Sequence, residues 1–556
     1  MQFDPLVKRR PLLLAALVFV IGLWIVSAPV VRAQTDGVLQ INDALHDFLR
    51  LQKVLGRLPG AHLEHLPLSA GEARALLDTL HARDSLLTPY ERTELRRYRS
   101  GFESPLVRGL QSVVAAAYAN GRDLFALADD EYGLQINPHL YAEYGPVWGD
   151  VEPATAWRYA RGIRVSGHIG RYLFFESRLT ENRTKPAEYR FADRTAPRLG
   201  NVSGRGDLYD HFEAEALVGV RTRHVEVRFG RDENRWGPGI GSLLLSNYAS
   251  PYEQLQVRAT LGPVQLVSVM AGFSERRFQP SGDAIIPRKY AAFHRLSVQP
   301  IPSLTLSVGE AVIFSTDTLG ARTGFDLSYL NPIIFFRAAE RQRGSPDNVV
   351  ISGSASWRMK PGWEIYASLL LDEMKVSMIG DGWWGNKWGW MIGLVAAPTD
   401  RLMLRGEFAR LRPFLYSHAS AGSDYIHYND LIGHPAGPNS IDLAVFATYR
   451  IAPPFTASLH ASYTAHGRNP DGVNLGGDPL ESYDSREMEM GNTILQGVLE
   501  RTWIVEGWMG YELMPGLSGR AAVRILARDD EEEGATTWVS PSLVLTWGMP
   551  FAPARY

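Results

Sequence analysis

Apolar and polar residues alternate with a period of two along most of the chain. From Ile351 to Met359 every second residue is apolar or glycine, and the residues between them are serines and an arginine. The same alternation recurs at 363–371, 441–449, 455–463 and 519–527. Successive side chains of a strand point to opposite faces of a sheet. The pattern therefore predicts antiparallel strands with one apolar and one polar face.

The connections between these strands are short on one side and long on the other. Short turns lie at 222–224, 261–263, 360–362, 398–400, 452–454 and 514–516, and long polar connections at 182–208, 232–250, 273–290, 314–348, 373–387, 412–439 and 466–492. This asymmetry is typical of outer-membrane barrels rather than of soluble sandwiches, which also alternate. Strands counted from 134–144 to 536–549 number about 18, an even number. We therefore predict a mainly β fold, a transmembrane antiparallel β-barrel of about 18 strands.

Before residue 133 the period changes to that of a helix. Apolar residues recur at three- and four-residue steps from Ile41 to Leu55. Ser69 with Glu72, and Thr88 with Pro89 and Glu91, have the spacing of helix N-termini. We predict an N-terminal helical module at 34–132, followed by the barrel with long extracellular loops at 133–556. With an even strand number both barrel ends lie on the periplasmic side, so the helical module is expected there.

The first 33 residues resemble a secretory signal. Lys8, Arg9 and Arg10 precede an apolar run at 12–26, and Ala33 ends a small-residue cleavage site. We predict a signal peptide at 1–33 and Sec-type secretion to the outer membrane of a Gram-negative-type bacterium. The alternative is an uncleaved anchor, because 12–31 is about long enough to cross a bilayer.

Composition narrows the function classes. The chain has 45% hydrophobic and 21% charged residues, which indicates a folded protein, and its net charge of −3 argues against a nucleic-acid partner. It contains no cysteine, so disulfides and thiolate metal sites are excluded. The 14 Trp, 23 Tyr and 22 Phe residues are enough for aromatic girdles at both membrane interfaces. The familiar hydrolase, metalloprotease and nucleotide-binding motifs are missing, so we predict a non-enzymatic protein without cofactor or metal.

The tryptophan-rich stretch DGWWGNKWGW at 381–390 contains two kinds of position. Trp388 and Trp390 begin a lipid-facing row that continues through alternate residues to Ala396. Trp383 and Trp384 lie earlier, in or near an outside loop. For these two, a membrane-interface anchor and a sugar-stacking platform are both consistent with the sequence.

The segment from Tyr416 to His434 interleaves rings with amide and carboxylate groups. Rings that stack on sugar faces, beside groups that bond hydroxyls, are what glycan recognition needs. A plug or girdle loop is the structural alternative, and metal binding by His418, His427 and His434 lacks a recognised ligand spacing. The predicted polysaccharide-binding residues are Trp383, Trp384, Tyr416, His418, Tyr425, His427, Tyr428, Asn429 and Asp430.

Two further stretches carry candidate residues. WGPGIG at 236–241 has three glycines and a proline, so it predicts an irregular loop that folds inward or packs closely on the wall, with ligand contact as the alternative. Between 329 and 348 donors and acceptors are dense. We predict a lumen network of Arg337, Glu340, Arg341, Asp347 and Asn348, for which a polysaccharide groove is the other interpretation.

Several longer motifs resemble one known family. RWGPGIGSLLLSN at 235–247, YLNPIIFFRAAERQRGSPDNVV at 329–350, LLLDEMK and GWWGNKWG at 369–389, and RPFLYSH with YIHYNDLIGHPAGPN at 412–439 occur in this order. Together with PLSAGE at 67–72 they resemble the capsule-assembly Wzi family of outer-membrane β-barrel proteins. The resemblance runs from about residue 40 to the end. It implies a barrel with a periplasmic helical bundle that acts in surface attachment of polysaccharide.

The first functional hypothesis is therefore a barrel that binds and organises capsular or exported polysaccharide at the cell surface. A diffusion porin, indicated by the barrel and its arginine-bearing face, is the second. The third is a surface adhesion or gliding-motility component, because some relatives in gliding bacteria resemble such proteins. The expected partners are outer-membrane lipid, lipopolysaccharide, capsular or exopolysaccharide, and periplasmic export or motility proteins that dock on residues 37–132.

Overall fold

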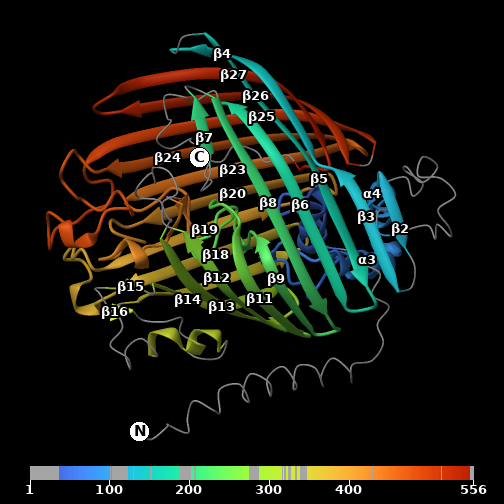
Figure 1. The fold of residues 1–556 in the computed structure, drawn as a ribbon, viewed down its shortest axis with the longest axis horizontal. Helices are drawn as coiled ribbons and strands as arrows, with labels where there is room; N and C mark the ends of the chain where they lie inside the picture. Colours follow the sequence, from blue (N-terminus) through green and yellow to red (C-terminus); the bar gives the residue numbers. More distant parts are fainter. Residues whose placement is uncertain are drawn as a thin grey trace, which may run out of the picture.

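The structure is a computed structural model of the chain (Figure 1). It describes residues 37–100, 102, 123–128, 131–150, 153–186, 202–205, 208–274, 287–315, 317–318, 321–322, 327–331, 335–338, 347–428, 430–514 and 516–550. The predicted signal peptide at 1–33 lies outside these residues. Among the described residues, no helix is long and apolar enough to cross a membrane.

The strands form one closed antiparallel barrel, as predicted, with 18 strands in the ring. Hydrogen bonds between β27 and β4 close it. β3 and β4 count as one strand of the ring, because both pair with β5 and are separated only at His139. The described barrel strands are β2 (Phe125–Ala128), β3 (Tyr132–Pro138), β4 (Leu140–Gly149), β5 (Ala154–Ile169), β6 (Leu173–Lys185), β7 (Val202–Arg205), β8 (Leu208–Arg221), β9 (Val225–Asp232), β11 (Tyr252–Leu261), β12 (Val264–Ser274), β13 (Arg288–Ile301), β14 (Leu304–Ser315), β17 (Asn348–Lys360), β18 (Trp363–Glu373), β19 (Lys387–Ala396), β20 (Leu402–Leu411), β23 (Ser440–Ala452), β24 (Phe455–Arg468), β25 (Val498–Met514), β26 (Leu517–Asp530) and β27 (Gly534–Trp547).

The first strand of the ring comprises β3 and β4, which together cover the expected strand at 134–144. Both pair with β5 in one register, since Pro138 faces Ile163 and Tyr141 faces Ala160. Proline has no N–H to donate to a sheet ladder. The amide of the next residue, His139, donates to the carbonyl oxygen of Gly162 at 3.0 Å, so the ladder continues between the two segments.

The outer face of the wall is apolar, as the alternation predicted. Val308, Leu459 and Leu543 are 61%, 51% and 71% exposed, and they lie on strands whose alternate residues face inward. On the inner face charged side chains pair with one another. Arg178 contacts Glu215 at 2.7 Å and Asp232 at 3.1 Å, and Arg524 contacts Glu506 at 2.7 Å. An apolar outside and a polar inside are what a membrane barrel requires.

The connections separate the barrel into two ends. All six predicted short turns join neighbouring strands at one end, here called the short-turn end. The other end, from which the described parts of the long connections leave the strands, is here called the long-loop end and lies on the left of Figure 1. Three short pairs lie within connections: β10 (Arg235–Trp236) pairs with β1 (His65–Leu66), β15 (Asp317–Thr318) with β16 (Ala321–Arg322), and β21 (Ile426–His427) with β22 (Asp430–Leu431).

The N-terminal segment contains α2 (Ala44–Val54), α3 (Ala70–His81), η1 (Asp84–Leu86) and α4 (Pro89–Ser100). Ser69 and Glu72 form the predicted reciprocal cap at the start of α3. Thr88 and Glu91 do the same at α4, with N–H to oxygen distances of 2.8 and 3.3 Å. The helices share an apolar core that includes Phe48, Leu77 and Leu95. The domain boundaries at 33 and 132 stay predictions.

The helical segment lies inside the barrel mouth at the short-turn end, as the blue ribbon of Figure 1 shows. Glu64 accepts a hydrogen bond from Arg295 at 2.7 Å, and the amide of Val38 donates to Glu176 at 2.9 Å. Both partners stand on the inner face of the wall. The segment therefore closes part of this mouth.

Candidate functional site

The WGPGIG stretch folds into the lumen, as its glycines predicted. The connection between β9 and β11 turns inward, and the amides of Ile240 and Gly241 donate to the carboxylate of Glu407 at 2.7 and 2.8 Å. The Tyr366 hydroxyl donates to the same carboxylate at 2.7 Å. A Cβ atom at Gly239 would collide with Glu407, so a side chain there would push the backbone away from its anchor. We call residues 233–251 the inward loop.

The connection between β20 and β23 packs on the inward loop from the long-loop end. The Tyr416 hydroxyl donates to the carbonyl oxygen of Leu243 at 2.8 Å, and the Ser246 hydroxyl donates to that of Gly433 at 2.6 Å. Tyr425 makes a further hydroxyl bond to Leu244. These loops share one buried apolar cluster with α2 and with strands β11 to β20. Within the described part of the chain, the lumen beside these strands is filled.

The second loop holds unusual backbone conformations. Phe414, Tyr416, Tyr428 and Asn439 have φ between 54 and 73°, a region that costs a residue with a Cβ atom on the order of 1 kcal/mol or more. Buried Asn439 also donates to Gly467 and Gln496 at 2.8 and 2.7 Å, and accepts from the amide of Leu495 at 2.7 Å. The packing around the loop therefore holds a conformation that the sequence alone disfavours.

A small pocket of about 230 Å³ opens beside this loop at the long-loop end. Its lining combines Arg337, Asp347, Asn348 and His418 with Val349, Asp372, Glu373, Ala419 and Tyr483. The pocket thus brings together members of both predicted residue sets. Beneath it, the buried Lys387 ammonium lies 3.1 Å from Asp372 and donates to the Ser417 carbonyl oxygen at 3.2 Å. This fixed pair supports the floor of the pocket.

An aromatic group borders the pocket. The ring of Trp384 lies 4.8 Å from that of Tyr483 and 5.8 Å from that of Trp383. The Arg486 guanidinium stacks on Trp384 at 4.2 Å, and the indole N–H donates to Glu489 at 2.8 Å. The ring of His418 meets Tyr483 at 5.4 Å. Trp383, Trp384, Tyr483 and Arg486 are all partly exposed, and we call them the aromatic platform.

The structure separates the two kinds of tryptophan in DGWWGNKWGW. Trp388 and Trp390 lie on β19, in the outward row that includes exposed Ile392 and Leu394. Trp383 and Trp384 lie in the connection before β19, where Trp384 packs against the connection between β24 and β25. The outward row therefore supplies the membrane-facing rings on this strand.

The remaining predicted ligand residues divide by burial. Tyr416, Tyr425 and His427 are at most 1% exposed and pack inside the loop. His427 accepts from the amide of Ser274 at 3.0 Å and stacks beside Tyr428 at 4.3 Å. Tyr428 and Asp430 are partly exposed at the β21–β22 turn, and Asn429 lies outside the described residues.

Burial lowers the pKa of two histidines in this loop, His418 and His427. Burial, together with the nearby charge of Lys387, lowers the pKa of His418 to about 3. Burial also lowers the pKa of His427 to about 3. Burial raises the pKa of Tyr483 to about 12, so its phenol keeps its proton. The described residues contain no group of three or more His, Asp or Glu arranged to hold a metal ion.

The predicted lumen network is only partly described, because Glu340 and Arg341 lie outside the described residues. The Tyr329 hydroxyl donates to Asp347 at 2.7 Å, and the Asn348 amide donates to the Ser423 carbonyl oxygen at 2.9 Å. The amide of Arg337 donates to Glu310 at 3.1 Å. The three described members therefore lie at the rim of the pocket, near the long-loop end.

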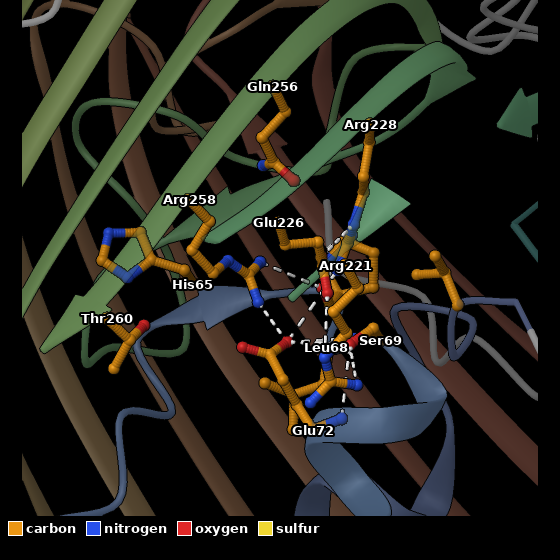
Figure 2. A network of polar contacts seen from close by, with 12 residues as sticks. His65, Leu68, Ser69, Glu72, Arg221, Glu226, Arg228, Gln256, Arg258 and Thr260 are labelled. Atoms are coloured by element: carbon orange, nitrogen blue, oxygen red, sulfur yellow. Dashed lines mark hydrogen bonds and ion pairs between the residues drawn. The ribbon is translucent and has the colours of Figure 1, made fainter. Parts of the chain in front are cut away.

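A separate polar network fixes the helical segment to the wall at the short-turn end (Figure 2). Glu72 pairs with Arg258, and Arg228 lies 3.9 Å from the same carboxylate. Arg221 donates to the Ser69 hydroxyl at 3.0 Å. Burial alone would raise the pKa of Glu72, but these arginines outweigh it and lower the pKa to about 2.

Sequence reasoning missed several residues of the long-loop site. Tyr483 and Arg486 lie in a connection that was recognised only as a long polar stretch. Asp372 and Lys387 stand at facing ends of β18 and β19, where Asp372 follows one apolar run and Lys387 precedes the next. That break in the alternation was the available signal. The contact between the rings of Trp384 and Tyr483 joins positions about 100 residues apart, which periodicity does not reveal.

Comparison with known proteins gives one family and a shared fold. The family described as capsule assembly protein Wzi matches residues 209–518, more than half of the chain. No curated protein sequence matches the chain. Among solved structures, Wzi of Escherichia coli is similar with a TM-score of 0.56 and 13% identity, over 93% of this chain and 100% of that one. It is described as an outer-membrane protein involved in group 1 capsule assembly and as a carbohydrate-binding β-barrel.

Two Pseudomonas aeruginosa proteins are also similar. OccK8 (OprE) has a TM-score of 0.42 and 11% identity, over 74% of this chain and 97% of that one. OprD has a TM-score of 0.39 and 10% identity, over 73% and 94%.

Proposed function

Because the chain belongs to the capsule assembly protein Wzi family, we propose that it binds capsular or another exported polysaccharide at the cell surface and organises it there without catalysis. The aromatic platform is the observation that carries this proposal. Trp384 is held on three sides, by Tyr483, by Arg486 and by Glu489, yet it stays partly exposed. A fixed ring of this kind binds a sugar face without losing much conformational entropy.

The neighbouring pocket supplies polar groups to the same ligand. Arg337, Asp347 and His418 line it beside Tyr483, so donors and acceptors for sugar hydroxyls stand within reach of the platform. Tyr428 and Asp430 extend the surface on the β21–β22 turn. Buried Tyr416, Tyr425 and His427 support the surface from within, because their rings pack the loop that carries His418 and Tyr428.

The topology proposed here places the long loops outside the cell and the helical segment on the periplasmic side, after Sec-type secretion. Outer-membrane lipid and lipopolysaccharide then surround the apolar outer face. Export or motility proteins would meet residues 37–132. A diffusion porin is the weaker hypothesis, because the inward loop and residues 412–439 fill the lumen beside β11 to β20 within the described residues.

The test is Trp384→Ala, alone and with Tyr483→Ala, in cells that display the polymer. We expect the amount of polysaccharide retained at the cell surface to fall. The affinity of the purified protein on a glycan array should drop by about tenfold, because stacking of a sugar on one ring is worth on the order of 1 kcal/mol or more. Trp357→Ala, which removes an exposed ring from the outer wall, is the matched control. Unchanged retention and unchanged array binding in the double variant would contradict the proposal.

A further inference from the structure

A second cavity lies at the opposite end from the aromatic platform. It has a volume of about 680 Å³, within the range of small-ligand sites, and opens between the helical segment and the inner wall at the short-turn end. α2 and α4 form one side, and β20 and β23 to β27 form the other. We call this cavity the short-turn chamber.

The wall of the chamber carries two adjacent rows of inward side chains. Arg450, Thr456, Gly510 and Arg520 are direct partners across β23, β24, β25 and β26. Thr448, Ser458 and Trp508 form the next row. Strands lie about 4.8 Å apart, so the backbone positions of the two arginines are separated by about 14 Å. The rows present guanidinium, hydroxyl and indole groups along an extended surface.

The two arginines, Arg450 and Arg520, have different surroundings in the chamber. Arg450 is only 6% exposed, and its Nη1 has no hydrogen-bond partner among the described residues, although the side chain lines the chamber. A buried guanidinium N–H without an acceptor is unfavourable, because it loses its hydrogen bond to water, and a bound anion would restore that bond. The Arg520 guanidinium stacks on Trp508 at 4.6 Å and lies over Gly510, where a Cβ atom would meet its side chain at 2.8 Å.

Five carboxylates line the chamber, and four of them are engaged by close partners, whereas Asp47 on α2 is 51% exposed and lies 4.0 Å from Arg405. Glu94 pairs with Arg97 at 3.0 Å, and Glu512 pairs with the same arginine. Asp43 caps α2 by accepting from the amide of Leu45 at 2.9 Å, and Asp123 accepts from the Asn137 amide at 2.6 Å. The wall therefore faces a ligand with cationic and neutral groups rather than with free negative charge.

We propose that the short-turn chamber binds a carboxylate-bearing saccharide, such as a uronate-containing segment of polymer, as a second site distinct from the aromatic platform. Guanidinium groups match carboxylates in a planar, paired geometry. Trp508 and the row of hydroxyls suit the faces and hydroxyls of sugar rings. A small inorganic anion fits less well, because the two arginines stand apart on a rigid sheet instead of converging on one point. The proposal rests on the proposed function, since it assigns a second contact to the same class of polymer.

The experiment titrates the mature protein in detergent micelles with a tetra-galacturonate and with its carboxyl-reduced, neutral counterpart. We expect the acidic probe to bind about tenfold more tightly or better, with an affinity that falls as salt rises. Arg450→Gln with Arg520→Gln should abolish that preference. Thr456→Trp, which keeps both guanidinium groups but fills the space between them, should weaken the acidic probe as well. Arg96→Gln, an exposed position on α4 outside the chamber, is the control and should change nothing.

Several other outcomes would overturn the proposal for the short-turn chamber without contradicting the proposal for the aromatic platform. Equal binding of the two probes, or unchanged binding in the double arginine variant with a normal melting temperature, removes the chamber as a carboxylate site. Displacement of the acidic probe by millimolar sulfate would indicate an adventitious ion site only. Loss of the acidic probe in Trp384→Ala but not in the chamber variants would assign the binding to the aromatic platform. If the polymer-retention test of the platform fails while the chamber preference stands, the proposed function fails and the chamber does not.

Discussion

Glu407 holds the inward loop, so its replacement should open the lumen. Its carboxylate accepts hydrogen bonds from two backbone amides and from the Tyr366 hydroxyl, all at 2.7–2.8 Å, and the side chain is 3% exposed. In Glu407→Gln one oxygen still accepts, but the new NH₂ group faces a donor. A hydrogen bond to a charged group is worth about 1.5–3 kcal/mol and a neutral one about 1 kcal/mol, so losing the Gly241 bond and making the other two neutral weakens loop docking by about 3 kcal/mol. Since each 1.4 kcal/mol is a factor of ten, the undocked fraction should rise about a hundredfold.

The absence of cysteine from the chain makes a clean assay available. Ala249→Cys places one thiol on the inward loop, at a position that is 4% exposed in the docked state. The rate of maleimide labelling then measures how often the loop undocks. We expect about a hundredfold faster labelling in the Glu407→Gln background and about tenfold in Tyr366→Phe, which removes one of the three bonds.

The control and a second readout make the result decisive. Glu253→Gln changes a carboxylate whose side chain is 68% exposed on β11 and should leave the labelling rate unchanged. In planar bilayers the wild-type barrel should conduct rarely, and Glu407→Gln should conduct in longer bursts. Equal labelling rates in wild type and Glu407→Gln would refute the anchoring role. Steady conductance of the wild type would refute the occluded lumen.

Two further predictions concern Glu72, which pairs the helical segment with the wall, and Asn439, which holds the end of the connection between β20 and β23. Glu72 has a pKa of about 2 in the folded protein, below its ordinary 4.5, so its contribution of about 3 kcal/mol is present above pH 4.5 and is lost as pH falls toward 2. Hydrogen exchange of α3, corrected for intrinsic rates, should accelerate in this window in wild type and show no such dependence in Glu72→Gln. Asn439→Ala removes three hydrogen bonds at a residue with φ of 54°, and should lower the free energy of unfolding by about 3 kcal/mol in urea titrations. Asn439→Gly loses the same three hydrogen bonds but also relieves the backbone strain, so it should be less harmful than Asn439→Ala. An equal loss in both variants would show that backbone strain is minor.

The strands of the barrel wall were predictable from the sequence, because alternate residues face lipid and lumen and therefore alternate between apolar and polar. Alternation at 351–359 and 363–371 gave both the strands and the side that faces outward, and β17 and β18 pair through the predicted turn at 360–362. Glycine-rich WGPGIG predicted an inward loop for a local reason, since only small residues allow the backbone to approach Glu407. These features depend on neighbours in sequence or on the solvent alone.

The loop contacts were less predictable because they join distant segments through side chains. Tyr416, Tyr425 and His427 have the composition of a sugar site, yet they pack inside the protein against the inward loop and Ser274. Nothing in a Tyr- and His-rich stretch says which rings face the solvent. The Glu94–Arg97–Glu512 contact of the chamber likewise joins a helix to a strand turn more than 400 residues away.

Because the lumen between them is filled, the aromatic platform and the short-turn chamber can influence each other only indirectly. Ser440 at the long-loop end of β23 and Arg450 near the short-turn end are ten residues apart, about 34 Å along the strand. A ligand at one end therefore cannot touch the other end. Any coupling has to pass through the buried cluster that links α2, the inward loop and residues 412–439. If that cluster is rigid, the effects of Trp384→Ala and of the chamber arginine variants on total saccharide binding add. They should depart from additivity only when Glu407→Gln frees the loop between the two sites.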